Sequence, residues 1–395
     1  MHLLKSLGFA AICAAAVACG TNHAPVSTTQ EAWNPANDPS KFAVRPAKFA
    51  ALPLEGILPD AVYPWSDDYW ATKRAGIAYR WQQHYPTPTG TYKDYRYQVL
   101  TRADFVAGAN STPALVDKLS PAEKYDLLQS RYEFPLVKQE FRNQLSAVSN
   151  GDVPGWFGIC HGWAPATVME REPGAKVVAT NRDGIDVPFY TSDINALMSK
   201  VYADYLGATR FIGERCNTSS NEIRVDAQGR VIADACRDTN PATLHLVLAS
   251  YLGKQNVAQR QGFVADVTRD AEVWNQGITG YKVVSNETTP FVAAQDPAAR
   301  HRAPGTTQLV HVKTEMYYIG EIAPHRAPAA SRRDEYTQTQ ELEYTLELDR
   351  NGTIIGGEWI SEDRPDFIWS PLAAPAENAT LSYRTIRDLL DRSRQ

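Results

Sequence analysis

This 395-residue sequence has few cysteines, no surplus of basic residues and, after its first residues, no long hydrophobic run. Its net charge of −5 lacks the basic excess that phosphate binding needs, which argues against nucleic acid as a partner. No apolar stretch beyond the N-terminal region reaches the length of a transmembrane helix. With no internal repeat and 43% apolar residues, the chain is long enough for two globular domains or one large one.

The N-terminus is the apolar exception. Lys5 supplies a positive charge, and residues 7–17 form a hydrophobic segment too short to span a bilayer. The following Ala16-Val17-Ala18-Cys19 resembles the lipobox of bacterial lipoproteins, in which the cysteine is acylated and becomes the mature N-terminus. Its first position is Ala where Leu is commoner. Ordinary secretion, with cleavage after a small residue such as Ala18, is the alternative.

Residues 1–19 are therefore predicted to be a signal peptide with a lipobox. The protein is then a bacterial cell-envelope lipoprotein or a secreted protein, and its only membrane contact is a lipid anchor at Cys19. Residues 20–60 are rich in Pro, Ala, Thr and Asn and show no periodicity, which predicts a flexible tether.

The scarce cysteines separate into distinct roles. Cys13 lies inside the signal segment and is removed with it. Cys216 and Cys236 flank a segment, 222–233, that has the pattern of a β-hairpin, so an oxidising compartment favours a disulfide between them. Cys160 is then left as a free thiol, which favours a chemical use. The alternative is that Cys160 pairs with one of the other two.

Cys160 lies in a turn built from glycine, proline and tryptophan, residues 151–163, which leads into an expected helix at 164–169. Proline near a helix start is tolerated because the first N–H groups have no intrahelical partner. A thiol at a helix N-terminus feels the positive end of the backbone dipole and ionises more easily, as a nucleophile requires. The competing interpretation is a small hydrophobic residue that fills the core.

A cysteine nucleophile needs a base within hydrogen-bond reach and a group that orients the base. His161 is adjacent in sequence, but neighbouring side chains diverge, so His245 is the better candidate base. Asp266, in the middle of an expected strand, is the candidate third member, with catalytic residues predicted as Cys160, His245 and Asp266. The fallbacks for the third position are Asn275 and Asp270.

The oxyanion of such a reaction would be stabilised by the backbone N–H of Cys160 at the helix start. Papain-like proteases add a glutamine six residues earlier, where this chain has Pro154. An indole N–H from Trp156, Trp70 or Trp65 is an alternative donor, although tryptophan in such dense aromatic sequence usually packs in the core.

Periodicity and capping residues predict a mixed fold. Helices are expected at 120–128, 136–148, 192–202, 240–253 (or a turn feeding a strand) and 382–391. Strands are expected at 176–179, 185–189, 262–268, 308–318, 341–348 and 353–360, with two short strands around a bend in 272–284. The sequence leaves open whether the strands after residue 305 belong to the same sheet as those before residue 190.

A calcium site is a further hypothesis for the turn between the strands at 176–179 and 185–189. Asn181, Asp183 and Asp186 carry oxygens there, but their spacing does not match an EF-hand. Ordinary turn hydrogen bonding is the favoured explanation.

Two motifs carry a family resemblance. Segment 158–166 (Gly-Ile-Cys-His-Gly-Trp-Ala-Pro-Ala) and segment 272–283 (Glu-Val-Trp-Asn-Gln-Gly-Ile-Thr-Gly-Tyr-Lys-Val) resemble the transglutaminase elicitor family, known from Phytophthora cell walls and with bacterial members. Segments 120–128 and 356–359 are similar too, so the resemblance spans about residues 60 to 370. The family's proline after Trp-Asn-Gln is Gly277 here, so its recognition by plants is not carried over.

This resemblance implies an α+β fold: a papain/transglutaminase-like core with the nucleophile at a helix N-terminus packed on an antiparallel sheet. It implies protein-glutamine γ-glutamyltransferase activity and a Cys-His-Asp triad matching Cys160, His245 and Asp266. Its partners would be protein substrates that carry glutamine and lysine or other primary amines. No cofactor is required by the sequence; calcium use in the family allows a metal, but no ligand set is legible.

The expected domain organisation is a catalytic domain at 61–375, β-rich from about residue 305, followed by a C-terminal helix within 376–395. Two other functions remain open at this point. One is a cysteine peptidase, amidase or deamidase with the same triad, since the sequence does not distinguish amine from water as the acceptor. The other is a non-catalytic envelope binding lipoprotein in which Cys160 is structural.

Overall fold

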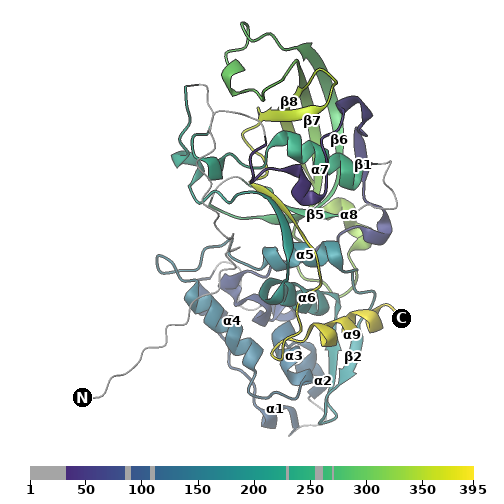
Figure 1. Cartoon of the computed structure of the whole chain (residues 1–395). Coiled ribbons are helices and arrows are strands. Elements are labelled where there is room, and N and C mark those ends of the chain that lie inside the picture. The colour runs from purple at the N-terminus through teal and green to yellow at the C-terminus, as the bar shows by residue number, and fades with distance from the viewer. Residues whose placement is uncertain (1–32, 85–89, 107–111, 228–230, 254–260, 269–270) are drawn as a thin grey trace, which may run out of the picture.

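The computed structural model describes residues 33–84, 90–106, 112–227, 231–268 except 254–260, and 271–395 (Figure 1). The predicted signal peptide and Asp270 lie outside these residues. In Figure 1 helices gather at one end of the molecule and long strands at the other, with α5 (Cys160–Met169) between them. No helix of the described part is long and apolar enough to cross a membrane.

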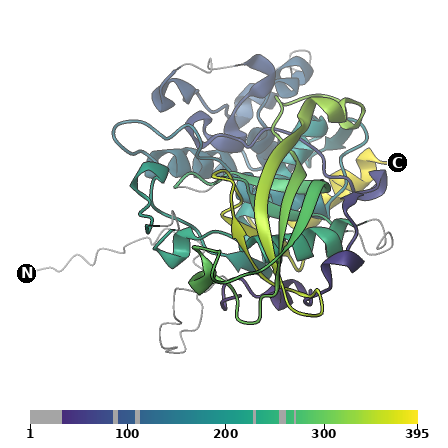
Figure 2. The same ribbon diagram turned by 90° about the horizontal axis from the view of Figure 1, so that it is seen from above.

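The strands form one large antiparallel sheet of order β4-β10-β5-β6-β7-β8-β9, with β1 paired to β6, and a separate hairpin, β2–β3. Figure 2 shows the long green strands of this sheet lying side by side. The strands of the described residues are β1 (Glu55–Ile57), β2 (Val177–Thr180), β3 (Asp186–Phe189), β4 (Thr209–Gly213), β5 (Phe263–Asp266), β6 (Asn275–Pro290), β7 (Gln308–Ile319), β8 (Thr337–Leu348), β9 (Ile354–Trp359) and β10 (Phe367–Pro371).

The helices begin where the sequence places caps. Ser120 and Glu123 form the predicted capping box at the start of α3, and the Asn240 side chain accepts from the N–H of Ala242 at the start of α7. The α-helices of the described residues are α1 (Arg102–Val106), α2 (Thr112–Asp117), α3 (Pro121–Leu128), α4 (Pro135–Ser146), α5 (Cys160–Met169), α6 (Thr191–Tyr205), α7 (Pro241–Leu252), α8 (Arg333–Tyr336) and α9 (Tyr383–Ser393). The α+β class, the six predicted helices and most of the predicted strands are confirmed.

Two hydrophobic cores lie on opposite faces of the sheet, and β5 contributes to both. Val264 packs in the core that contains α5, α6 and Cys160, whereas Phe263 and Ala265 pack in the core that contains α7. This follows from the two-residue period of a strand, which sends successive side chains to opposite faces. Figure 1 accordingly shows α5 and α7 on either side of β5.

Several local predictions need correction. Within 272–284, residues 275–284 form one continuous strand, the first part of β6, in which irregularities at Ile278/Gly280 and Val283/Ser285 take the place of a bend. The hairpin at 222–233 is reduced to a single bridge between Val225 and Val231 in its described part. The strands after 305 extend the sheet of β5 and β6, and not the β2–β3 hairpin.

The predicted tether is also wrong in its second half. Phe42, Val44 and Phe49 are buried in the core beside α7, and β1 pairs with β6 in the main sheet. Short 3₁₀ helices at Pro39–Phe42 and Phe49–Ala51 turn the chain so that these side chains point inward. The packed fold therefore begins well before residue 60.

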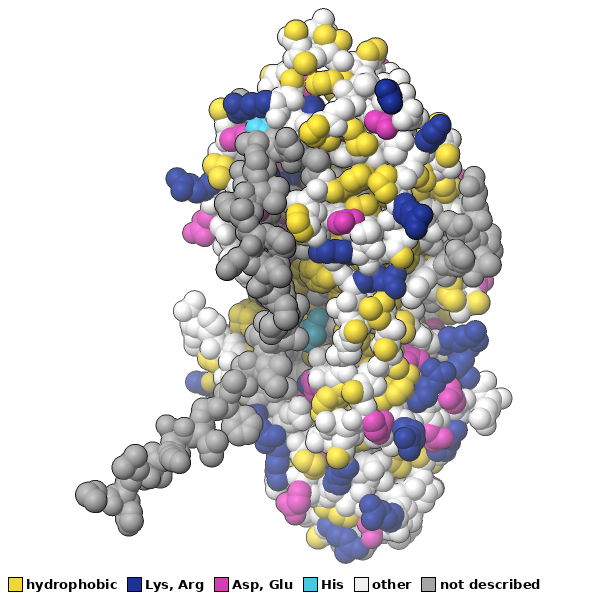
Figure 3. Space-filling model, viewed as in Figure 1, with side chains coloured by type: hydrophobic (Ala, Val, Ile, Leu, Met, Phe, Trp, Pro, Cys, Tyr) yellow, Lys and Arg dark blue, Asp and Glu magenta, His cyan; other side chains and the backbone are white. Residues whose placement is uncertain are grey.

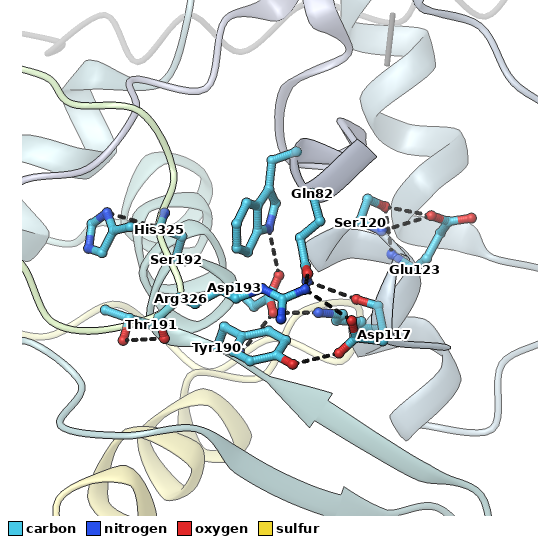
Figure 4. Close-up of polar contacts among 12 residues, drawn as sticks. Gln82, Asp117, Ser120, Glu123, Tyr190, Thr191, Ser192, Asp193, His325 and Arg326 are labelled. Atoms are coloured by element: carbon cyan, nitrogen blue, oxygen red, sulfur yellow. Dashed lines mark hydrogen bonds and ion pairs between the residues drawn. The ribbon is translucent and has the colours of Figure 1, made fainter. Parts of the chain in front are cut away.

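A polar network anchors the segment after β7 to the helical end. The backbone N–H of His325 donates to Ser192 Oγ at 2.6 Å, and Arg326 contacts Asp117 at 3.1 Å (Figure 4). On the surface in Figure 3, basic and acidic side chains are interspersed, so that face carries no large region of one sign.

Candidate active site

Cys160 is the first residue of α5, as the sequence predicts, and the turn before it is held in place. Ile159 N–H donates to the carbonyl of Tyr69 at 2.8 Å, and Thr72 N–H donates to that of Phe157 at 2.8 Å. Gly162 lets α5 approach α6 closely, since a Cβ there would lie 2.2 Å from the carbonyl oxygen of Ser199. The N–H groups of Gly162 and Trp163 donate to the carbonyl of Ile159, whereas the N–H of Cys160, the first of the helix, has no intrahelical partner and is placed to stabilise negative charge.

Asn275, at the start of β6, covers the sulfur. Its Nδ2 lies 3.7 Å from Cys160 Sγ, and the thiol contacts the carbonyl of Val273 at 3.5 Å. Trp369 Nε1 donates to Asn275 Oδ1 at 2.7 Å. Because an indole N–H can only donate, Oδ1 must face Trp369, which directs the amide N–H groups toward the sulfur.

Asp266 is the cross-strand neighbour of Asn275 and lies on the same face of the sheet. One carboxylate oxygen, Oδ1, accepts from Trp274 N–H at 2.9 Å and from Thr268 Oγ1 at 2.8 Å. The other, Oδ2, is buried and has no hydrogen-bond partner among the described residues. Burial raises the pKa of Asp266 to about 7, although these hydrogen bonds lower it.

The Cys160 thiol itself is protonated in this state, contrary to the expectation from the helix dipole. Burial raises the pKa of Cys160 to about 11, although hydrogen bonds from the backbone and side-chain N–H groups of Asn275 lower it. The carboxylates of Asp266 and Glu321 raise it further. Cys160 is only 5% exposed, so the loss of solvation outweighs the field of one helix end.

His245 is not brought to Cys160, and its predicted role as the base is corrected. It lies on α7, which packs on β1, β6, β8 and β9, whereas α5 packs on β5, β6 and β10. Its Nδ1 lies 2.8 Å from Tyr344 Oη, and its ring lies 5.6 Å from that of Phe49 in the core on the opposite face. Burial lowers the pKa of His245 to about 4, so the ring is neutral.

No described contact joins the other candidates from the sequence, the three tryptophan N–H donors and His161, to the sulfur. Trp65 Nε1 donates to the carbonyl of Glu170, and Trp70 is 1% exposed in the core. Trp156 contacts the ring of Phe157, and His161, the residue after Cys160, is exposed. The side chain of Asn275, which the sequence offers only as a fallback, is the donor that the structure places at the sulfur.

The turn proposed for calcium uses its oxygens in hydrogen bonds. Asn181 Oδ1 accepts from the N–H groups of Asp183 and Ile185, and Asp183 contacts Arg102 and Tyr132. These contacts are the ordinary hydrogen bonds of a turn, which the sequence favours over a calcium site. Among the residues described, no group of three or more His, Cys, Asp or Glu side chains is arranged to hold a metal ion.

The predicted disulfide is present. Cys216 and Cys236 are bonded, and Cys160 is free, so the alternative pairings are excluded. Cys216 N–H donates to Asp366 Oδ2 at 2.7 Å, and Asp366 N–H in turn donates to the carbonyl of Asp266. The disulfide thus supports the strand end that carries Asp266.

The family model described as "Transglutaminase elicitor" matches residues 46–395. The chain belongs to the transglutaminase elicitor family. Among solved structures, it is similar to the crystal structure of the GP42 transglutaminase from Phytophthora sojae, with 26% identity and a TM-score of 0.66. That match covers 92% of this chain and 99% of the other. No curated protein matches significantly.

The family motif at 273–276 forms one wall of the site. Val273 offers its carbonyl to the thiol, Trp274 donates its N–H to Asp266, Asn275 contacts the sulfur and Gln276 Nε2 donates to Glu321 at 2.9 Å. A Cβ at position 277, where the family has proline, would lie 3.0 Å from Thr167 Oγ1 on α5.

Two residues of the site were not predicted from the sequence. Trp369, on β10, and Glu321, just after β7, come from parts of the chain that carried no motif. The β10 strand itself was missed, as was β4. A short apolar run that contains Trp369 was the only available signal for β10, and nothing marked Glu321.

Proposed function

We propose that this protein transfers the acyl group of a protein glutamine to a primary amine through a thioester on Cys160. The observation that carries the proposal is the arrangement on one sheet face: a thiol at a helix start, an amide donor aimed at it and a carboxylate of raised pKa beside it. Family membership over residues 46–395 supports the same chemistry.

In acylation, the carboxylate of Asp266 takes the proton from Cys160 Sγ as the sulfur attacks the glutamine carboxamide carbon. The developing oxyanion accepts hydrogen bonds from Asn275 Nδ2 and the backbone N–H of Cys160. Asp266 then returns the proton to the leaving nitrogen, the C–N bond breaks and ammonia departs. A base with a pKa near neutrality suits both steps, which supports Asp266 in a larger role than the orienting one expected from the sequence.

In transfer, a primary amine attacks the thioester carbon and the C–S bond breaks. The proton lost from the nitrogen returns to the sulfur by way of Asp266, and the product is an isopeptide bond. Water in place of the amine would give deamidation.

The test is incorporation of a fluorescent primary amine into a glutamine peptide, with ammonia release measured in parallel. Cys160→Ala should abolish both signals, while its circular dichroism and melting temperature match those of the unaltered protein. Ammonia release without amine incorporation would identify a hydrolase instead. Neither signal from the unaltered protein, or full activity in Cys160→Ala, would refute the proposal.

We also propose that the protein works in the cell envelope or outside the cell, on protein substrates with glutamine and amine groups. The Cys216–Cys236 disulfide supports an oxidising compartment. Attachment through a lipid on Cys19 is tested by metabolic labelling with a fatty acid. Cys19→Ala should lose the label; a label retained in that variant would contradict the lipid anchor.

A further inference from the structure

Tyr69 makes three contacts with the turn that leads into Cys160. Its carbonyl accepts from the N–H of Ile159 at 2.8 Å, and its hydroxyl donates to the carbonyl of Gly155 at 2.7 Å. Its ring lies so close to Gly158 that a Cβ there would be 2.5 Å from Cδ2 of the ring. Tyr69 therefore fixes the backbone immediately before the nucleophile.

The peptide group between Ile159 and Cys160 carries the N–H that would stabilise the developing oxyanion. The carbonyl of this peptide accepts from the N–H groups of Gly162 and Trp163, at 2.9 and 2.8 Å. Because a trans peptide is planar, its N–H points away from its carbonyl, so the position of Ile159 sets the direction of the Cys160 N–H. A shift of Tyr69 that moves Ile159 also moves this donor.

An unusual backbone conformation at Trp70 directs Tyr69 towards the turn. Trp70 has a φ of 53°, in the left-handed region that a bulky residue rarely adopts. Its N–H donates to Asp68 Oδ1 at 2.7 Å, which closes a tight turn around Tyr69. A conformation of this kind persists only where its surroundings enforce it, and the Asp68 carboxylate supplies such a contact.

Arg74 holds the Asp68 carboxylate in its turn. Its Nη2 lies 2.7 Å from Oδ1 and 2.6 Å from Oδ2 of Asp68, and both side chains are largely buried. The short 3₁₀ helix Thr72–Arg74 is also bonded to the nucleophile turn, because Thr72 N–H donates to the carbonyl of Phe157 at 2.8 Å. Burying two charges carries a desolvation cost that their attraction offsets only in part, so the geometry that this pair fixes explains it better than stability does.

We propose that Asp68 and Arg74 are positioning residues for acyl transfer. Through the backbone of Trp70 and Tyr69, they hold the peptide before Cys160 so that its N–H meets the oxyanion. The inference rests on the proposed acyl transfer. The N–H is needed only when the glutamine carbonyl becomes tetrahedral, so its displacement lowers kcat and leaves the KM for the glutamine peptide nearly unchanged.

The experiment measures incorporation of dansylcadaverine, a fluorescent primary amine, into a glutamine peptide. Asp68→Ala removes the acceptor for Trp70 N–H and the partner of Arg74, and should lower kcat about 10²-fold, as for a displaced oxyanion donor. Asp68→Asn keeps an acceptor at Oδ1 but loses the charge, and should lower kcat about 10-fold. The KM for the peptide should change less than about 3-fold in both variants.

Arg74→Lys and Arg80→Lys form a matched pair. Arg80 bonds both carboxylate oxygens of Glu123, a buried residue that caps α3. Each variant thus removes one guanidinium from a buried carboxylate, but only Arg74 acts on the nucleophile turn. Both should lower the melting temperature, whereas only Arg74→Lys should lower kcat per active site, by about 10-fold. Equal losses of kcat in the two variants would contradict the positioning role.

Gly158→Ala perturbs the same contact from the opposite side, because the added Cβ meets the ring and the carbonyl of Tyr69. It should lower kcat, and its effect should be less than additive with that of Asp68→Asn, since both act through Tyr69. Alkylation of the thiol by iodoacetamide forms no oxyanion, so its rate should change less than about 3-fold in Asp68→Asn.

Unchanged kcat in Asp68→Ala would overturn the positioning role, as would a higher KM for the peptide at unchanged kcat. If that variant fails to fold, Asp68→Asn and Gly158→Ala carry the same test. Additive effects of these two, or alkylation that accelerates as transfer falls, would contradict the role. Absence of Cys160-dependent transfer in the unaltered protein would instead refute acyl transfer, and the role with it. Cys160-dependent transfer that is unchanged in all these variants would refute the positioning role alone.

Discussion

The two faces of the sheet around β5 differ in which polar groups they bring together. On one face, Cys160, Asp266 and Asn275 converge, and the Asp266 carboxylate keeps one oxygen without a partner in the described residues. On the other, His245 is bonded to Tyr344 through Nδ1 among apolar side chains, and its Nε2 also has no partner in the part of the chain that the structure describes. Residue type alone would choose the histidine as the base. The comparison teaches that proximity to the thiol, and not residue type or an unpaired atom, decides which group can act.

The largest effect that separates the two faces is expected for Asp266→Asn. The change keeps an acceptor at Oδ1 and removes the base, so kcat for amine incorporation should fall about 10²- to 10⁴-fold. In the unaltered protein, kcat/KM should rise with pH up to about 7, as the carboxylate of Asp266 loses its proton, and this rise should vanish in the variant. An unchanged pH profile would exclude Asp266 as the base.

The same substitution, which lowers activity, should raise the free energy of unfolding relative to the unaltered protein as the pH rises. Because the folded-state pKa of Asp266 is raised, its favourable contribution is complete below the ordinary value near 4 and is lost as pH rises through about 7. Asp266→Asn should therefore gain stability relative to the unaltered protein as pH goes from 5 to 8. Urea denaturation at both pH values measures this; a constant difference would contradict the raised pKa.

A smaller, graded effect is expected for the amide donor. Asn275→Ala removes the N–H aimed at the sulfur and should lower kcat about 10²-fold, within the range for loss of one oxyanion donor. Trp369→Phe keeps Asn275 but frees its orientation, and should cost about 10-fold. Steady-state kinetics on both variants test the order. An effect of Trp369→Phe larger than that of Asn275→Ala would show that the tryptophan acts in another way.

The smallest effect on activity is expected for His245→Gln. Loss of the bond to Tyr344 should reduce the free energy of unfolding by about 1–3 kcal/mol. Activity per folded molecule should stay within about 3-fold of the unaltered protein, because the ring lies across the sheet from the sulfur. Kinetics normalised to active-site titration measure this. A 100-fold loss would restore His245 as the base and break the comparison.

Much of the fold could be predicted from local signals. Ser120 and Glu123 mark the start of α3, and Asn351-Gly352 marks the turn between β8 and β9. The Cys216–Cys236 disulfide is favoured by the expected oxidising compartment and by the pattern between the two cysteines, with a pairing of Cys160 left open. Helix caps and tight turns depend on a few adjacent residues, so the sequence shows them directly.

The assembly of the site could not be predicted so well. Whether α7 covers the face of Val264 or that of Ala265 depends on tertiary packing, and that choice removes His245 from the site. Trp369, on β10, bonds to Asn275, and Glu321, just after β7, bonds to Gln276, although both lie far from β6 along the sequence. The helix position of Cys160 was visible, but its burial, which reverses the expected pKa shift, was not.

The most direct test of acyl transfer on this face is mass spectrometry of the protein mixed with a glutamine peptide and no amine. The account predicts a covalent adduct on the proteolytic fragment that contains Cys160, with the mass of the peptide less ammonia, which disappears when dansylcadaverine is added. An adduct on another residue, or ammonia release with amine incorporation that persists in Cys160→Ala, would contradict it.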